Sequence, residues 1–482
     1  MTVWLRASGA PHAVRAPADR AEVGELPNAT MDDVKQAVAA ARDALDGWRR
    51  GAPHARAAIL RRGAEGLRAH LSELASLHAR ESGKVITQAR KEVLGAADLL
   101  EANASLGRFA KGEVAPTGAV PGFERDLTWV ERVPLGIIVC IIPFNFPVEL
   151  TIEKAGAALA AGNVAIVKPP PQNPLATART VEILVEAGLP EAVLQVVPGG
   201  ADVGSALCTA PGVDAVSLTG SVGAGLAVAA ATAQLLRPLH LELGGNGASI
   251  VLGDADLQHV VLETIRGRTL MNGQACAATK RLVVERSRAR DLTERLDEAL
   301  GAVRMGDPLD EASELGPLID RSAAARVADQ VRRAREQGAS LVRGSWKVDD
   351  AWFPPALLAD VPIDADVARD DEIFGPVATV IPVAGDDEAV RVVNASSLGL
   401  TAAVFSADLP RAISIAERLQ VGGVVINGTN NYRPPVVPFG GVGMAGYGRE
   451  GLGYSYEELT RTRFIALRGV RPATAPIGDA DG

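Results

Sequence analysis

The sequence predicts an α/β protein with a doubly wound parallel sheet, and three observations lead to this fold class. Apolar runs between residues 136 and 243 are short and uninterrupted, as in strands buried on both faces of a sheet. Helix-length segments separate these runs, and strand and helix alternating at this pitch implies right-handed crossovers. The chain is also long enough, because 482 residues with 47% hydrophobic composition can build two or three domains around real cores.

The N-terminal quarter is expected to be mostly helical. Apolar positions recur at helical spacing over residues 31–50, and Ala- and Leu-rich amphipathic segments continue over residues 56–111. The pattern then changes to short β-like runs over residues 128–135, which end at a proline turn. The doubly wound sheet is therefore expected to begin only after this region.

Strands and helices of the sheet follow in order. Strands are expected at residues 136–142, 164–167, 194–197, 215–218 and 239–243. Helices are expected between them at residues 150–161, 175–187, 202–208 and 223–235. A second set of helices and strands runs from residue 253 to about residue 440 with no long linker, so a second lobe is expected to pack directly on the first. Sheets of this kind bind ligands at the carboxyl ends of their strands.

Composition excludes several function classes. The net charge of −9 and the absence of a basic stretch argue against nucleic-acid binding. The N-terminus has no continuous apolar region of a secretory signal, and no window approaches the roughly 18 to 20 apolar residues of a membrane span, so the expected location is the cytoplasm. Six histidines without HExxH or Cys/His pairing predict no metal site, and three cysteines leave at least one thiol free.

Three strand ends carry groups suited to a dinucleotide or an oxyanion. The loop TGSVGAG, residues 219–225, opens a helix whose free N–H groups suit a pyrophosphate, although glycine-rich turns are common. Lys168 ends another strand, where it is either a ligand of the same pocket or a surface lysine. Asn145 in PFNFP can donate a hydrogen bond to an oxyanion, or be an ordinary turn residue.

Two further segments carry a base and a nucleophile. Glu242 in LELGG lies between apolar neighbours, where a carboxylate titrates upward toward the range of a general base, unless a salt bridge holds it. Cys276 in NGQACAATKR lies among small residues at an expected helix end, with room for a reactant at sulfur. Taken alone, either residue could be structural.

Together these motifs resemble the NAD(P)-dependent aldehyde dehydrogenase family. The resemblance extends from ESGK at residues 81–84 through PFNFP, LTGSVGAG, LELGG, NGQACA and EIFGPV to PFGGVGMAGYGRE at residues 438–450. The motifs occur in the family order, and the 34-residue step from Glu242 to Cys276 is the family spacing. The resemblance therefore covers nearly the whole chain.

The resemblance implies a role for each catalytic residue. Cys276 would attack the aldehyde, and Asn145 together with the Cys276 backbone N–H would hold the oxyanion. Glu242 would activate the water that hydrolyses the thioester, and Lys154 would support the network. The thiolate is expected to be favoured by nearby positive potential.

The resemblance also implies a set of cofactor contacts. Lys168 would face the adenosine ribose, Ser221 the pyrophosphate and Glu372 the nicotinamide ribose. The full set is Ile142, Pro143, Phe144, Lys168, Gln172, Gly204, Thr219, Gly220, Ser221, Gly244, Glu372 and Phe374. Pro171 stands where many NAD-preferring members carry a glutamate, so NADP is admissible beside NAD.

Departures from the family pattern bear on the substrate. Phe144 replaces the usual tryptophan, and Gly443 and Asn246 are similar to the branch that oxidises benzaldehyde- and vanillin-type substrates, so an aromatic or hydrophobic aldehyde is expected. Likeness to non-phosphorylating glyceraldehyde-3-phosphate dehydrogenases is opposed by Ala275, which replaces their arginine. Arg433 and Glu149 are candidates for substrate contact or for solvated charges.

The resemblance further implies a domain plan and an oligomer. Residues 1–115 and 136–243 would form the dinucleotide-binding domain, residues 244–442 the catalytic domain, residues 116–135 and 455–470 the oligomerisation strands, and residues 471–482 a flexible tail. Shared sheet edges predict a homodimer or homotetramer. Two alternatives to a hydrolytic enzyme stay open, a CoA-acylating semialdehyde dehydrogenase and an inactive binding protein on the same fold.

Overall fold

A six-stranded sheet forms the centre of the N-terminal half of the protein. The computed structural model describes residues 4–472. The strand order is β19-β9-β8-β5-β6-β7, parallel throughout except for β19, which pairs antiparallel with β9. The strands are β5 (Ile137–Ile141), β6 (Val164–Lys168), β7 (Leu194–Val196), β8 (Ala215–Thr219), β9 (Leu239–Glu242) and β19 (Gly446–Tyr447). The expected parallel, doubly wound sheet is confirmed.

Helices cover both faces of this sheet. The helices that follow its strands are α7 (Leu175–Glu186), α8 (Ala201–Thr209) and α9 (Val222–Thr232), close to the expected ranges. The helix expected at 150–161 is instead a continuous run of α5 (Pro147–Thr151), a π-helical turn at Ile152–Gly156, and α6 (Ala157–Ala160). It starts earlier than expected because proline fits the first helical position, where no N–H is needed.

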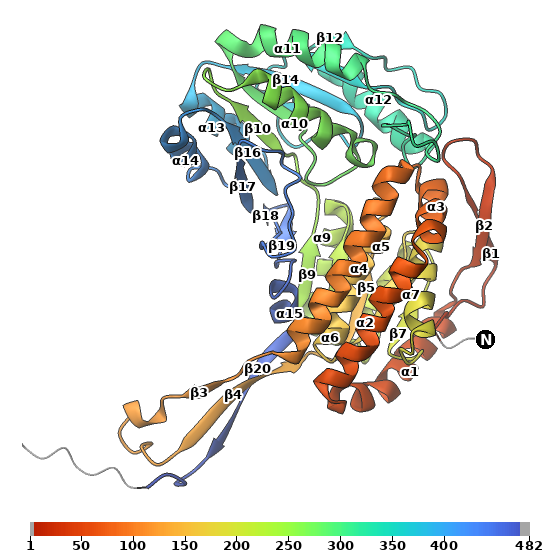
Figure 1. The fold of residues 1–482 in the computed structure, drawn as a ribbon, viewed down its shortest axis with the longest axis vertical. Helices are drawn as coiled ribbons and strands as arrows, with labels where there is room; N and C mark the ends of the chain where they lie inside the picture. Colours follow the sequence, from red (N-terminus) through yellow and green to blue (C-terminus); the bar gives the residue numbers. More distant parts are fainter. Residues whose placement is uncertain (1–3, 473–482) are drawn as a thin grey trace, which may run out of the picture.

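Four N-terminal helices extend this half of the molecule. They are α1 (Met31–Arg50), α2 (Pro53–Ala69), α3 (Leu71–Ser82) and α4 (Ile86–Arg108). Helix α1 packs on β5 and β6, and the other three pack on the helices that cover the sheet. Thr30 and Asp33 form a capping box that fixes the start of α1. Figure 1 shows α2 and α4 side by side along this half of the molecule. The hairpin of β1 (Pro11–Arg15) and β2 (Glu22–Pro27) precedes them and was not expected from the sequence.

A second sheet follows in the chain and forms the other lobe, at the top of Figure 1. Its strand order is β12-β13-β14-β11-β10-β16-β17, and only β12 is antiparallel to its neighbour. The strands are β10 (Ala248–Val251), β11 (Arg281–Glu285), β12 (Ser340–Arg343), β13 (Ala356–Ala359), β14 (Val377–Val383), β16 (Thr401–Phe405) and β17 (Gly423–Ile426). The helices around it are α10 (Leu257–Thr269), α11 (Arg286–Gly301), α12 (Arg321–Glu336), α13 (Asp386–Asn394) and α14 (Leu409–Ala416).

Three strands form a flap that projects away from both lobes (Figure 1). These are β3 (Glu113–Ala115), β4 (Leu127–Pro134) and β20 (Thr460–Leu467), in the order β20-β4-β3 and antiparallel. A short helix, α15 (Tyr454–Glu458), leads into β20. Residues 116–135 and 455–470 therefore lie together, and the expected tail lies outside the described residues from position 473 onward.

Within residues 4–472, no helix combines the length and the apolar character needed to cross a bilayer.

Candidate active site

A cavity of about 670 Å³ lies beside the carboxyl ends of β8 and β9 and brings the predicted catalytic residues together. Asn145, Glu242 and Cys276 all line it, although they come from three distant segments of the chain. The remaining lining side chains are mixed, being those of Gln88, Lys91, Glu92, Phe146, Glu149, Leu150, Thr219, Glu263, Arg266, Thr269, Leu270, Ala275, Ala277, Thr429, Asn431, Arg433 and Phe439.

The turn that carries Cys276 is built from left-handed backbone. Met271, Asn272 and Gly273 have φ values of 48°, 57° and 78°, in a region that L side chains rarely adopt. The Asn272 side chain holds this turn through hydrogen bonds of 2.8 Å to the Gly83 carbonyl and 2.7 Å to the Pro317 carbonyl. Cys276 thus lies in a turn seven residues beyond the end of α10, not at a helix end as expected.

Lys280 fixes the same turn from inside the protein. Its buried ammonium donates to the carbonyls of Ala275 at 2.9 Å and Cys276 at 2.7 Å, and also to that of Gly245. Three carbonyl acceptors thus converge on one cation, which sets the position of the cysteine backbone.

Glu242 ends β9 and points into the cavity. Glu242 is the strand partner of Gly446 in β19, and its backbone carbonyl accepts a hydrogen bond of 3.0 Å from the Gly220 N–H. Burial, and then the negative charge of Glu450, raise the pKa of Glu242 to about 8. Its carboxylate lines the same cavity as the thiol of Cys276, and Oε1 has no hydrogen-bond partner among the described residues. A carboxyl with a raised pKa thus shares the cavity with a thiol, as a general base would need to.

The thiol itself is not activated in the way the sequence suggested. Burial, followed by the charge of Glu242, raises the pKa of Cys276 well above its ordinary value, and the opposing effects of Arg433 and Lys280 are smaller. The expected net lowering by positive potential is therefore wrong, because burial and the charge of Glu242 outweigh the two cations. The thiol needs a base to ionise it, and the Glu242 carboxyl lines the same cavity.

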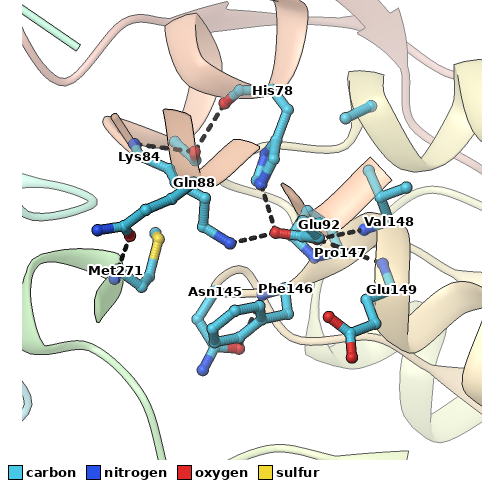
Figure 2. A network of polar contacts seen from close by, with 12 residues as sticks. His78, Lys84, Gln88, Glu92, Asn145, Phe146, Pro147, Val148, Glu149 and Met271 are labelled. Atoms are coloured by element: carbon cyan, nitrogen blue, oxygen red, sulfur yellow. Dashed lines mark hydrogen bonds and ion pairs between the residues drawn. The ribbon is translucent and has the colours of Figure 1, made fainter. Parts of the chain in front are cut away.

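Asn145 lies in the turn before α5, next to Phe146 (Figure 2). Its Nδ2 donates 3.0 Å to the Gln274 carbonyl, and its Oδ1 accepts 3.1 Å from the Phe146 N–H. These two bonds fix the amide orientation and leave the second N–H of Nδ2 for another acceptor.

Lys154 lies behind the cavity wall in a buried charge network. Its Nζ donates 2.7 Å to Oε1 of Glu450 and 3.1 Å to Oγ of Ser217. Arg433 binds the other oxygen, Oε2, of Glu450 at 2.6 Å, and stacks 4.1 Å over the Phe439 ring. Burial works against ionisation of Glu450, but Lys154 and Arg433 outweigh it and lower its pKa to about 2. Lys154 thus reaches the cavity through Glu450 and Arg433.

Arg433 and Glu149 both line the cavity, which the sequence had left undecided. The Arg433 charge is compensated by Glu450. Burial raises the pKa of Glu149, and the charge of Arg433 opposes this shift. Neither residue is therefore a freely solvated surface charge.

The expected cofactor residues form a second group along the strand ends. Ile142 donates to the Lys168 carbonyl at 3.1 Å, and Lys168 donates to the Pro169 carbonyl at 2.8 Å. Burial lowers the pKa of Lys168 to about 8. A Cβ on Gly204 would lie 3.3 Å from Cδ of Lys168, so the glycine admits the lysine stem. Pro171 and Gln172 are exposed beside this group.

The loop after β8 offers donors without protein partners. Ser221 caps α9 by accepting from the Ala224 N–H at 3.2 Å, which leaves the helix N-terminus suited to an anion. The buried Oγ1 of Thr219 has no hydrogen-bond partner among residues 4–472. Gly220 continues this loop.

Glu372 and the aromatic pair complete the group near Cys276. Glu372 pairs with Lys280 at 2.7 Å, and a Cβ on Gly244 would lie 2.5 Å from its Oε2. Phe144 and Phe374 meet edge to face with ring centroids 6.0 Å apart. Pro143 lies between Ile142 and Phe144 in the loop after β5. These residues, with the Ser221 helix end and the unpartnered Thr219 hydroxyl, are the groups along the strand ends that would hold a dinucleotide.

Several residues of the site carried no clear sequence signal. Lys280 and Glu450 stand inside motifs that were recognised, yet nothing in their spacing links them to Cys276 or Lys154. Glu92 gave no signal at all, because its partners lie in three separate segments.

Comparison with known proteins identifies the family. The model of the aldehyde dehydrogenase family matches residues 4–465. The chain belongs to the aldehyde dehydrogenase family. It is 37% identical to a 3-sulfolactaldehyde dehydrogenase of Priestia aryabhattai over 445 residues, which cover 92% of each chain. It is 36% identical to a betaine aldehyde dehydrogenase of Cereibacter sphaeroides over 472 residues, which cover 97% of this chain and 96% of the relative.

Solved structures agree with this assignment. The NADP-dependent glyceraldehyde-3-phosphate dehydrogenase of Bacillus halodurans, solved with NADP, matches with a TM-score of 0.93 at 34% identity and covers 96% of this chain and 97% of its own. An NAD-dependent aldehyde dehydrogenase of Sinorhizobium meliloti matches with a TM-score of 0.92 at 33% identity and covers 97% and 93%. This aldehyde dehydrogenase therefore uses NAD or NADP, as expected.

Proposed function

We propose that this aldehyde dehydrogenase oxidises an aldehyde to the carboxylic acid, with water as the acyl acceptor. The single observation that carries the proposal is that Cys276, Glu242 and Asn145 line one cavity although they come from three distant segments of the chain. A nucleophile, a base and an amide donor facing one space form the set that acyl chemistry at sulfur requires.

In the first half of the reaction Cys276 adds to the aldehyde carbonyl. Glu242 takes the thiol proton, and the sulfur forms a bond to the carbonyl carbon. The oxyanion that forms is stabilised by the free N–H of Asn145 Nδ2 and by the Cys276 backbone N–H. When bound, the dinucleotide supplies the acceptor for the hydride that leaves this carbon. Collapse of the oxyanion leaves a thioester on Cys276.

In the second half Glu242 first releases the thiol proton to solvent. It then accepts a proton from water, and the resulting hydroxide adds to the thioester carbon. The C–S bond breaks, the acid leaves, and the sulfur regains the proton that Glu242 took from water. The raised pKa of Glu242 places it in the range where one carboxyl can take up and release protons near neutral pH. We place Lys154 behind this step, because it holds Glu450, whose charge acts on Glu242.

The carboxyl group of Glu242 also favours this reaction over two alternatives. A CoA-acylating semialdehyde dehydrogenase has no need of a base for water, and here a carboxyl with a raised pKa lines the same cavity as Cys276. An inactive binding protein has no need to keep Cys276, Glu242 and Asn145 around one cavity.

The test is a purified-enzyme assay of aldehyde-dependent NAD(P)H formation. Cys276→Ala is expected to abolish it, whereas Cys208→Ala, at a buried cysteine that does not line the cavity, should leave the rate within about twofold. Product formation that requires CoA would replace the hydrolytic reaction by the acylating one. Undiminished activity of Cys276→Ala would refute the thioester route.

We propose an aromatic or hydrophobic aldehyde as substrate, as in the benzaldehyde and vanillin branch. Phe146, Leu150, Leu270 and Phe439 provide apolar wall beside Cys276. A panel of benzaldehyde, vanillin, a long aliphatic aldehyde, betaine aldehyde, succinate semialdehyde and 3-sulfolactaldehyde tests this choice. If a charged aldehyde gives the highest kcat/KM, the apolar wall is not what selects the substrate.

We also propose that the flap of β3, β4 and β20 joins subunits into a dimer or tetramer. Phe464 on its edge strand β20 is 71% exposed, and an unpaired strand edge favours pairing with another chain. Phe464→Lys is expected to shift the species seen by sedimentation velocity toward monomer. An unchanged oligomer would place the interface elsewhere.

A further inference from the structure

Glu92 of α4 is a buried carboxylate whose two oxygens are fully used by four donors. Oε2 contacts Nε2 of His78 at 2.9 Å and the ammonium of Lys84. Oε1 accepts the backbone N–H groups of Val148 at 3.0 Å and Glu149 at 3.3 Å. Burial works against ionisation, but His78 and Lys84 outweigh it and lower the pKa of Glu92 to about 2. The group is therefore a fixed negative charge.

The two backbone donors belong to the first turn of α5. The first N–H groups of a helix have no partner inside the helix and need an acceptor from elsewhere. Phe146, at the cap position, provides no side-chain acceptor, and Pro147 has no N–H. Glu92 therefore caps α5 from another helix, and its charge also suits the positive end of the helix dipole.

Lys84 contacts the other part of the same turn. Its ammonium lies 3.8 Å from the centroid of the Phe146 ring and is fully buried, a geometry that binds a cation to the ring face. Phe146 donates its N–H to Oδ1 of Asn145 at 3.1 Å. Figure 2 shows the chain of contacts from Lys84 and Glu92 to the Asn145 turn. Lys84 thus contacts Phe146, directly after Asn145, and Glu92 binds the backbone N–H groups two and three residues further along the same turn.

We propose that the buried Lys84–Glu92 pair is a positioning pair, which fixes the turn at residues 145–149 so that the Asn145 amide faces the sulfur of Cys276. This inference rests on the proposed function, because it assigns a purpose to the orientation of Asn145. The pair acts through that amide and does not touch the reacting atoms.

Glu92→Gln is the sharpest variant, because the amide is nearly isosteric with the carboxylate. An amide has one acceptor oxygen, so its NH₂ must face either His78 and Lys84 or the two backbone donors. One donor pair loses its acceptor and the turn loosens. Because small misplacements of a catalytic group are costly, kcat is expected to fall at least about tenfold, with KM for aldehyde and cofactor within about threefold.

Glu81→Gln is the matched control. Glu81 is equally buried and caps α7 through the N–H groups of Leu175 at 2.9 Å and Ala176 at 2.8 Å, but it does not line the cavity. Its kcat is expected to stay within about twofold of the wild-type value even if its Tm falls. If Glu92→Gln does not fold, Lys84→Met provides the same test, because it removes the cation from Phe146 and leaves the helix cap in place.

The decisive measurement is a double-mutant cycle with Asn145→Ala. If Glu92 acts through Asn145, then Glu92→Gln in the Asn145→Ala background lowers kcat by less than about twofold, although it costs at least about tenfold alone. Equal losses in both backgrounds, or a kcat of Glu92→Gln within about twofold of wild type, would overturn the positioning role. Failure of the proposed function is distinguishable, because then Asn145→Ala itself is as active as the wild type.

Discussion

Nζ of Lys280 donates a hydrogen bond of 2.7 Å to the carbonyl oxygen of Cys276. The same ammonium pairs with Glu372 at 2.7 Å, so one buried cation holds both the nucleophile turn and a proposed cofactor contact. The geometry of Cys276 thereby depends on a residue four positions further along the chain, directly before β11.

Lys280→Met is expected to lower kcat at least about tenfold, because three carbonyl acceptors lose their donor and the cysteine turn is free to shift. KM for NAD(P) should rise as well, since Glu372 loses its partner. Steady-state kinetics measure both values. The exposed Lys35→Met is the control, and a Lys280→Met enzyme with wild-type constants would show that the turn is held without this cation.

The second prediction concerns the pH dependence of the wild-type enzyme. Burial and Glu450 raise the pKa of Glu242 to about 8, so its base form appears only as the pH rises through that value. The kcat/KM for the aldehyde is therefore expected to rise with pH to a plateau above about 8. Glu242→Gln should lose about 10²- to 10⁴-fold in rate, as expected for removal of a general base, and the rise near this pH should vanish. A variant that keeps the same rise would show that another group titrates.

The third prediction concerns Glu450, whose negative charge adds to burial in raising the pKa of Glu242. Glu450→Gln removes that charge and frees Lys154 and Arg433 to act on Glu242. The rising limb of the pH profile should move down by about one unit, because a nearby opposite charge favours the ionised carboxylate. Glu458→Gln, at an exposed position nearby, should leave the profile in place. A limb that stays put or moves upward contradicts the coupling.

Much of this fold could be predicted because several of its strands have a recognisable apolar pattern within a few consecutive residues. The short apolar runs at residues 137–141 and 164–168 are strands of the central sheet that are buried on both faces. Uninterrupted apolar composition over so few residues is typical of such strands. The hairpin of β1 and β2 was missed because its strands are short and largely exposed, so alternation is weak. The π-helical turn at Ile152–Gly156 was also missed, since one extra residue in a buried helix leaves little trace in the apolar pattern.

In the candidate site, too, residues in local motifs could be predicted, whereas interactions between distant segments could not. Cys276, Glu242 and Asn145 stand in recognisable motifs, and the cavity brings them together. The raised pKa of Cys276 was not foreseen, because burial is a property of the assembled lobes. The Lys154–Glu450 pair spans 296 positions in the chain, and no local pattern connects residues so far apart.

The fourth prediction concerns stability in acid. Lys154 and Arg433 outweigh the burial that opposes ionisation of Glu450 and lower its pKa from 4.5 to about 2. A depressed carboxyl pKa stabilises the folded state above the unfolded pKa, and this contribution is lost as pH falls from 4.5 toward about 2. The free energy of unfolding of Glu450→Gln should therefore fall less over this range than that of the wild type. Parallel curves from denaturant titrations would contradict a depressed pKa.

The last prediction concerns the choice between NAD and NADP. Pro171 and Gln172 are exposed beside Lys168, and no carboxylate stands at position 171 to repel a 2′-phosphate. Pro171→Glu adds that charge, and like charges brought together in a binding site cost affinity. The ratio of kcat/KM with NADP to that with NAD should fall at least about tenfold.

Pro171→Gln supplies the control, because it adds a side chain of similar length without the charge. Its ratio should stay within about threefold of the wild-type value, since the repulsion is electrostatic. Raising the ionic strength should partly restore NADP use by Pro171→Glu for the same reason, because exposed charges are screened by salt. If Pro171→Glu and Pro171→Gln change the ratio alike, the ring of proline itself, and not the missing carboxylate, decides the cofactor.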